Sequence, residues 1–142
     1  MRIPALARLA AVAALTACAL PATAQNAPPP ADRVLLQVSD EDPKKWNLTL
    51  NNARNIQADL KGQVAIEIVA YGPGIGMLKA DALVANRVID AMAAGIQVVA
   101  CENTMTNQKI TKDDMLGGIG YVQAGVVEIM RKQQAGWAYI RP

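Results

Sequence analysis

The sequence predicts an α/β domain in which helices cover both faces of a single open, mostly parallel five-stranded sheet. Two features indicate this class. Short apolar runs of strand length alternate with longer segments of helical periodicity, and the first runs are continuously apolar, as expected of parallel strands buried on both faces. The five strands are expected at residues 33–38, 64–70, 97–100, 121–124 and 137–140.

The first expected helix runs from Trp46 to Lys61. Residues 39–43 precede it and supply N-cap and first-turn residues, with acidic side chains at the positive end of the helix dipole. Its buried face is predicted to contain Thr49, Ala53, Ile56 and Leu60. A separate stripe of Asn47, Asn51 and Asn55 has two interpretations, a solvated face or a ladder of amides that bonds to a neighbouring loop or subunit.

The second half of the chain contains two further long helices. The first is expected from Lys79 to Ala94, and its predicted buried residues are Leu83, Val84, Val88, Ala91 and Met92. The last is expected from Gly125 to Ala135, with Val126, Ile129 and Met130 facing inward. Between them we expect one short helical turn at residues 103–108 and the start of another at 111–114.

Residues 1–24 have the layout of a secretory signal peptide. Arg2 and Arg8 lead into an apolar run that is too short to cross a bilayer, and Ala22-Thr-Ala24 follows as a cleavage site. The sequence therefore predicts an exported, periplasmic protein that begins at Gln25. A proline-rich tether at residues 25–31 would connect this end to a single α/β domain at residues 32–142.

The same segment has a second interpretation. Leu15-Thr-Ala-Cys18 resembles a bacterial lipobox, in which the cysteine becomes lipidated. A lipid on Cys18 would anchor the protein to the membrane instead of leaving it soluble.

The charge and composition exclude several classes of function. Removal of residues 1–24, which hold two arginines and no acidic residue, leaves equal numbers of basic and acidic side chains. Nothing then favours binding to nucleic acid or to an anionic membrane. The chain has no histidine, which excludes Ser-His-Asp and Cys-His catalytic groups and most zinc sites, and we expect neither a metal nor a cofactor.

Three glycines follow the second expected strand, at Gly72, Gly74 and Gly76. Their spacing does not fit a dinucleotide-binding fingerprint, and no Gly-Lys-Ser/Thr follows to make a P-loop. We therefore expect a tight connection that allows close approach of two backbone segments. Gly72 and Gly74 are kept as candidate ligand-binding residues because this loop lies at the carboxyl end of a strand.

Cys101 is the candidate catalytic residue. It ends the third expected strand, where ligands gather in parallel sheets, and a helix N-terminus following it would lower the pKa of its thiol. Glu102 opposes that effect, and Lys109 is a candidate to offset it. Asn103 and Thr104 are candidates to hydrogen-bond a bound group or to cap the next turn. The alternative is that Cys101 is a buried structural residue.

Several short segments occur in a specific order around these elements. They are Val38-Ser-Asp, Pro43, Trp46-Asn-Leu48, Leu50-Asn-Asn-Ala-Arg-Asn55, Gly72-Pro-Gly74, Gly95, Cys101-Glu-Asn-Thr-Met105, Ala124-Gly-Val126 and Trp137 to Pro142. In this order and spacing the chain resembles the DsrE/DsrF-like family, small α/β proteins of the YchN-like fold. The resemblance covers nearly the whole domain.

The resemblance implies a sulfur-handling protein. In the sulfur-carrying members of this family, a cysteine matching Cys101 accepts a sulfane sulfur as a persulfide and passes it on, and related members form trimers or hexamers. Here Asn103 and Thr104 would bond the persulfide, and the donor and the accepting thiol protein are unknown. The resemblance thus implies a sulfur carrier or sulfurtransferase-like protein that forms a homotrimer or homohexamer.

Two departures and two alternatives remain beside this interpretation. The family's well-understood relays are cytoplasmic, whereas this chain is expected to be exported, and many proteins of this fold have no demonstrated activity. One alternative is a non-catalytic oligomeric module, in which Cys101 is incidental and the loop at Gly72 to Gly76 lines a small-molecule cleft between subunits. The other is a thiol-redox protein that forms an intermolecular disulfide.

Overall fold

The computed structural model describes residues 32–142. The predicted signal peptide, the tether and Cys18 lie outside these residues. The elements, in chain order, are β1 (Asp32–Val38), α1 (Pro43–Asp59), β2 (Val64–Ala70), the 3-10 helix η1 (Gly72–Leu78), α2 (Ala85–Ala93), β3 (Gln97–Cys101), α3 (Glu102–Gln108), the 3-10 helix η2 (Lys112–Asp114), β4 (Gly120–Val122), α4 (Gly125–Gln134) and β5 (Ala138–Ile140).

The five strands form one sheet in the order β4-β3-β2-β1-β5. All four neighbouring pairs are parallel, which confirms the predicted fold class. Because β1 to β4 lie side by side in chain order, their carboxyl ends meet along one edge of the sheet. Cys101 and the start of η1 both lie at that edge.

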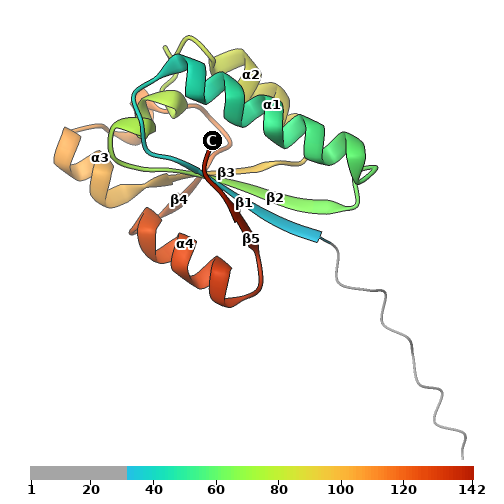
Figure 1. Ribbon diagram of the computed structural model, residues 1–142. Coiled ribbons are helices and arrows are strands. Elements are labelled where there is room, and N and C mark those ends of the chain that lie inside the picture. The colour runs from blue at the N-terminus through green and yellow to red at the C-terminus, as the bar shows by residue number, and fades with distance from the viewer. Residues whose placement is uncertain (1–31) are drawn as a thin grey trace, which may run out of the picture.

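The helices cover the sheet unequally (Figure 1). Helices α1 and α2 pack on one face, over a large aliphatic core, while α4 alone covers the other face. The α4 side has a much smaller buried cluster, formed by Leu35, Val69 and Ile129. The candidate cysteine therefore lies at one end of a sheet whose second face is covered by a single helix.

Local interactions explain where α1 begins and how it packs. The Asp42 carboxylate caps the helix by accepting a hydrogen bond from the Lys44 N–H at 2.8 Å, and Pro43 occupies the first turn, where no N–H is needed. Trp46 lies in the core and donates its indole N–H to the Asp40 carbonyl at 2.8 Å. These contacts fix the connection that follows β1.

The asparagine stripe on α1 forms part of an interface between helices. Arg87 of α2 donates one guanidinium nitrogen to Asn47 and the other to Asn51, the latter at 2.7 Å. Asn55, one turn further along, is exposed. Two of the three amides therefore bond to a neighbouring element, which is a helix and not the loop or subunit that the sequence suggested.

The helix predicted from Lys79 is shorter than expected and begins at Ala85. Lys79 forms an antiparallel bridge with Met115, and the Ala80 N–H donates to the Asp114 carbonyl at 2.9 Å. These backbone groups are committed to a distant segment and cannot start a helix. The prediction that Leu83 is buried was wrong, since Leu83 precedes the helix and is 86% exposed.

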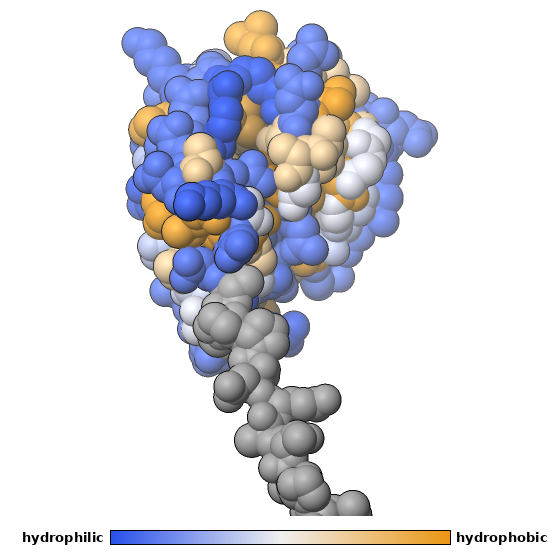
Figure 2. Space-filling view, turned by 90° about the vertical axis from the view of Figure 1, so that its right-hand side faces the viewer, coloured by the Kyte–Doolittle hydropathy of each residue, from blue (hydrophilic) through white to orange (hydrophobic). Residues whose placement is uncertain are grey.

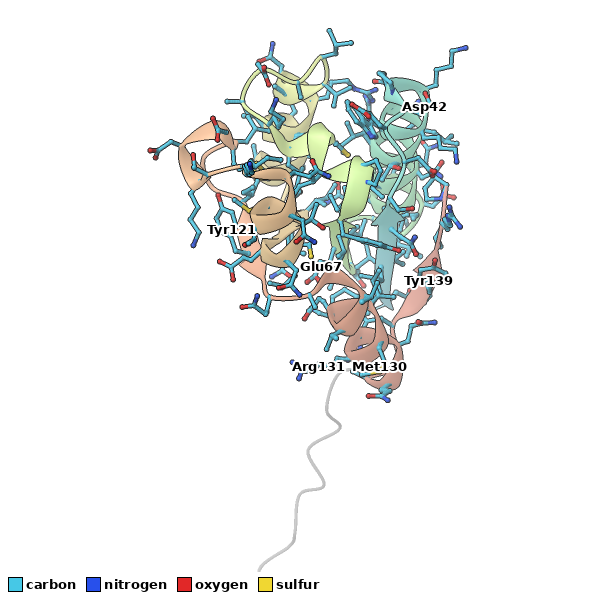
Figure 3. The ribbon with its side chains drawn as sticks, turned by 90° about the vertical axis from the view of Figure 1, so that its left-hand side faces the viewer. Asp42, Glu67, Tyr121, Met130, Arg131 and Tyr139 are labelled. Atoms are coloured by element: carbon cyan, nitrogen blue, oxygen red, sulfur yellow. The ribbon has the colours of Figure 1, made fainter. Side chains whose placement is uncertain are left out.

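The predicted inward face of α4 was also partly wrong. Ile129 is buried, but Val126 and Met130 are 57% and 48% exposed. Figure 3 shows Met130 and Arg131 on the side of α4 away from the sheet. The inward positions are taken instead by Gly125, Ile129 and two charged residues, Glu128 and Lys132, whose side chains are mostly buried.

Lys132 faces inward because the sheet presents a buried acid to it, and Glu128 lies beside the same ammonium. Glu67 of β2 is only 3% exposed, and its Oε2 accepts a hydrogen bond from Lys132 Nζ at 2.7 Å. The same ammonium lies 3.6 Å from Glu128 and 4.2 Å from the centre of the Trp137 ring. An ion pair therefore lies between α4 and the sheet, at a position where a helix and a sheet usually make apolar contacts.

The surface of the domain is largely hydrophilic at the end where β1 begins (Figure 2). Apolar residues appear there in separate patches between polar ones. Among residues 32–142, no helix is both long and apolar enough to span a bilayer.

Candidate functional site

The sulfur of Cys101 lies where three elements meet. Cys101 is the last residue of β3 and also the N-cap of α3, and its register partner on β4 is Val122. Helix α4 begins at Gly125, three residues beyond Val122. The thiol therefore faces the N-terminal ends of two helices, where backbone N–H groups lack partners within the helix.

Cys101 is buried in the single chain, with 5% of its surface exposed. Its Sγ lies 3.8 Å from the Gln123 carbonyl oxygen and donates to it when protonated. The same carbonyl accepts the Asn103 N–H at 3.0 Å, and the Gln123 amide donates to the Asn103 side-chain oxygen at 2.6 Å. Gln123 and Asn103 thus form an exposed pair beside the sulfur.

Opposing effects set the acidity of this thiol. Burial of the sulfur raises the pKa of Cys101, but the nearby donors, which are the Thr104 hydroxyl and the backbone N–H groups of Gly125, Thr104 and Asn103, lower it. The donors prevail, so the pKa lies below its ordinary value of 9.0. A larger share of Cys101 is then thiolate, the nucleophilic form, near neutral pH.

The acid next to Cys101 has a basic partner, although it is not the expected one. Glu102 lies 3.3 Å from the ammonium of Lys112, which also lies over the Tyr121 ring. Lys109, the candidate from the sequence, is instead the exposed, left-handed C-cap residue of α3. The counter-ion comes from η2, a segment whose path the sequence does not reveal.

Thr104 connects Cys101 to the glycine-rich loop. Its hydroxyl oxygen accepts the Gly72 N–H at 2.9 Å, so it does not cap the following turn. The carbonyl of the same glycine accepts a bond from the Gln108 amide at 3.2 Å. Helix α3 therefore holds the Gly72 peptide on both sides, while Gly72 itself has a left-handed φ of +54°.

Gly74 has a packing role, and its N–H donates to the Tyr71 carbonyl at 3.1 Å. A Cβ at Gly74 would lie 2.4 Å from the Val38 carbonyl oxygen, so only glycine allows η1 to lie against the end of β1. This is the close backbone approach expected from the sequence. Beside it is a cleft of about 380 Å³, and its lining residues are Glu41, Pro73, Gly76, Lys79, Gln108 and Ile110.

The sequence did not point to three residues that shape the site. Gln123 and Gly125 contact Cys101 from the β4–α4 connection, and Tyr71 packs against Gly125. Tyr71 is held in turn by a 2.7 Å hydrogen bond from Gln37 to its hydroxyl. The only signal for these residues in the sequence was the glycine at the start of α4. A helix that begins with glycine suggests that another residue packs closely against its first turn.

The residues described hold no group of three or more histidine, cysteine, aspartate or glutamate side chains suited to a metal ion. Cys101 is the one free cysteine among them. The chemistry of this site consequently rests on a single thiol, one hydroxyl and several backbone N–H groups.

A parallel five-stranded sheet with one buried thiol at its carboxyl edge defines a small α/β protein with a cysteine-centred site. The model of the DsrE/DsrF-like family matches residues 32–142, and the chain belongs to this family. No curated protein matches the chain.

Two solved structures are similar to this chain. A protein of unknown function from Methanobacterium thermoautotrophicum is 38% identical, with a TM-score of 0.75, over 78% of this chain and 99% of that one. A conserved protein of unknown function from Bacteroides thetaiotaomicron is 15% identical, with a TM-score of 0.66, over 78% of this chain and 95% of that one. The second likeness concerns the fold alone.

Proposed function

We propose that this protein carries sulfane sulfur as a persulfide on Cys101. The observation that carries the proposal is the set of hydrogen-bond donors around the sulfur, which come from the starts of α3 and α4 and lower the pKa of the thiol. Membership of the DsrE/DsrF-like family, which is linked to sulfur relay, supports it.

The transfer balances without an outside oxidant or reductant. The Cys101 thiolate attacks the outer sulfur of a persulfide or polysulfide donor, a new S–S bond forms, and the donor's S–S bond breaks. The donor's inner sulfur leaves as a thiolate with the bonding electron pair. An acceptor thiolate then attacks the outer sulfur of the Cys101 persulfide, and Cys101 leaves as the thiolate that began the cycle.

The same donors that stabilise the thiolate suit both of its roles. They lower the pKa of the attacking sulfur in the first step and stabilise Cys101 as the leaving group in the second. We place the outer sulfur of the persulfide beside the exposed pair of Asn103 and Gln123, whose Gln123 carbonyl oxygen lies 3.8 Å from Sγ. Asn103 is thus the side chain we assign to the outer sulfur, while Thr104 acts on Sγ.

The test is intact mass spectrometry after incubation with polysulfide. The native protein should gain about 32 Da, the mass of one sulfur atom, and lose it with dithiothreitol. The Cys101→Ala variant retains Cys18, so the mass gain that it lacks relative to the native protein is the sulfur carried by Cys101. A parallel sample in urea exposes the thiol. Uptake in urea but not in the native protein would identify a buried structural cysteine and overturn the proposal.

A second candidate function has its own observation, the cleft lined by Pro73, Gly76 and Lys79. This cleft adjoins the glycine-rich loop but not Cys101, so a bound small molecule would not require the thiol. Ligand-induced stabilisation that is equal in the native protein and in Cys101→Ala would favour this binding module.

We further propose that the protein is exported and acts as a homotrimer or homohexamer. Support for assembly comes from Val126 and Met130, which lie one turn apart on the outer face of α4 and are largely exposed. Light scattering of the purified protein reports its mass, and a monomer at micromolar concentration would refute this. N-terminal sequencing should begin at Gln25, whereas a lipidated Cys18 in the membrane fraction would establish the anchored form.

A further inference from the structure

Helices α1 and α2, which cover the same face of the sheet, are joined by side-chain hydrogen bonds at two places (Figure 1). In the first half of α1, Asn47 and Asn51 accept bonds from Arg87 of α2. Near the end of α1, the Gln57 amide donates to the Ala94 carbonyl at 2.9 Å, directly after α2 ends. A cavity of about 160 Å³ lies between the two helices, and Arg87, Gln57 and Ala94 all contribute to its lining. We call it the α1–α2 cavity.

The apolar part of this lining is buried. It consists of Leu50 from α1, Ala91 from α2 and Ile96, which precedes β3. An apolar cavity of about 150 Å³ in a protein can hold a molecule the size of benzene, so this one has room for a branched chain of about five carbon atoms.

Two arginines line the same cavity, Arg54 from α1 and Arg87 from α2. None of the ion pairs formed within residues 32–142 includes either of them. The two bonds from Arg87 go to uncharged amide oxygens, which fix the guanidinium group without neutralising its charge. A guanidinium group has five N–H donors, so three of those on Arg87 remain for a ligand.

The charges of the lining indicate which anion fits. Asp90, which is exposed, also lines the cavity, so its side chains carry two positive charges and one negative charge. A carboxylate supplies the single negative charge that balances them, whereas a phosphate monoester carries nearly two. Arginine also binds carboxylates through pairs of parallel N–H···O bonds.

We propose that the α1–α2 cavity binds a small carboxylate with a short aliphatic chain. The chain lies on Leu50, Ala91 and Ile96, and the carboxylate bonds to Arg54 and Arg87. Two sources share this chemistry, a short-chain fatty acid and an aliphatic amino acid, whose ammonium group would face Asp90. Cys101 does not line this cavity, so the site goes beyond the proposed sulfur chemistry.

The experiment titrates the ¹⁵N-labelled full chain with 4-methylpentanoate and, separately, with leucine, and follows the backbone amide NMR shifts. The two molecules share one carbon skeleton and differ only in the α-ammonium group. We expect saturable shifts that gather on the residues lining the cavity. Arg54→Gln should weaken this binding about tenfold, because it removes one charged hydrogen-bond donor. Arg54 is exposed and forms no ion pair within residues 32–142, so the variant should fold as the native protein does.

Arg131→Gln is the matched control. It makes the same change of charge at an exposed arginine on the side of α4 away from the sheet, and should leave the affinity at the native value (Figure 3). A second control replaces the ligand by 4-methylpentan-1-ol, which lacks the carboxylate and should bind at least tenfold more weakly.

Asp90→Asn distinguishes the two sources. If leucine binds more tightly than 4-methylpentanoate and loses that advantage in Asp90→Asn, the ligand is an amino acid, and the opposite order assigns a fatty acid. Absence of saturable shifts with both carboxylates would overturn the proposal. Equal affinities in Arg54→Gln and Arg131→Gln, or an alcohol that binds as tightly as the carboxylate, would overturn it too. No sulfur transfer enters this readout, so its outcome is independent of the role of Cys101.

Discussion

Gly74 faces the main chain of Val38 so closely that a Cβ on it would lie 2.4 Å from the Val38 carbonyl oxygen and 2.6 Å from the carbonyl carbon. The same oxygen accepts the Tyr71 N–H at 3.1 Å. This contact holds η1 against the end of β1 and so determines where Gly72 meets Thr104. Packing of the glycine-rich loop against β1 thus positions one hydrogen-bond donor, the Gly72 N–H.

Gly74→Ala is expected to lower the free energy of unfolding by about 3 kcal/mol, because the added methyl group meets backbone that cannot rotate away. Urea denaturation measures this loss. Gly117→Ala is the control, since a Cβ at Gly117 meets no atom within 4 Å. Equal stability of the two variants would show that the contact with Val38 is not tight.

Gly125→Ala should affect the thiol as well as the stability. Its Cβ would lie 3.0 Å from the Cβ of Tyr71, so the start of α4 must shift and its N–H must move relative to Cys101. We expect the thiolate titration of Cys101 to move to higher pH and the stability to fall by about 1 kcal/mol. A variant that loses stability while its titration stays unchanged would remove Gly125 from the set of donors.

The buried carboxyl of Glu67 predicts a pH dependence of stability. Burial raises the pKa of Glu67 above its ordinary value of 4.5, and the bond from Lys132 offsets this only in part. The folded protein then holds this proton more tightly than the unfolded chain. The contribution of Glu67 to stability is therefore full below about pH 4.5 and is lost as pH rises through the folded pKa.

Glu67→Gln removes that titration. Relative to the native protein, the variant should gain free energy of unfolding as the pH rises from about 4.5 through the folded pKa of Glu67, measured by urea denaturation. Glu41→Gln, at an exposed glutamate, is the matched control. A difference between native protein and Glu67→Gln that does not change with pH would contradict the raised pKa.

The asparagine stripe on α1 offers an internal comparison. Asn47→Ala and Asn51→Ala each remove an acceptor from Arg87 and should lower the free energy of unfolding by about 0.5–1 kcal/mol. Asn55→Ala removes no such bond and should stabilise the helix slightly, because alanine is the better helix former. Equal effects at all three positions would show that the hydrogen bonds from Arg87 contribute nothing measurable to the free energy of unfolding.

The sequence was sufficient for the sheet because its strands are short, mostly apolar runs between turn residues, and the second was located at the bounds that the structure gives, Val64–Ala70. It failed where long-range partners decide the local structure. The antiparallel bridge between Lys79 and Met115 moves the start of α2 to Ala85, and no local sequence pattern reveals that bridge. Likewise, the inward charges of α4 depend on Glu67, which is 61 residues or more away in the chain.

The candidate site could be predicted in part for the same reason. Position at the end of a strand identified Cys101, and Thr104 lies close enough in sequence to be named with it. Gln123, Gly125 and Lys112 reach the thiol or its neighbour only through the fold, so their roles required the structure.

The most direct measurement follows one sulfur atom onto and off Cys101. The full chain carrying Cys18→Ala is loaded with polysulfide, freed of excess reagent by gel filtration, and followed by intact mass, first alone and then with an added small-molecule thiol. We expect a gain of about 32 Da that persists until the thiol is added, because Cys101 is then the one cysteine of the chain and no second thiol can remove the outer sulfur. Absence of the gain, or its loss at the same rate without the thiol, would contradict a sulfur-carrying Cys101.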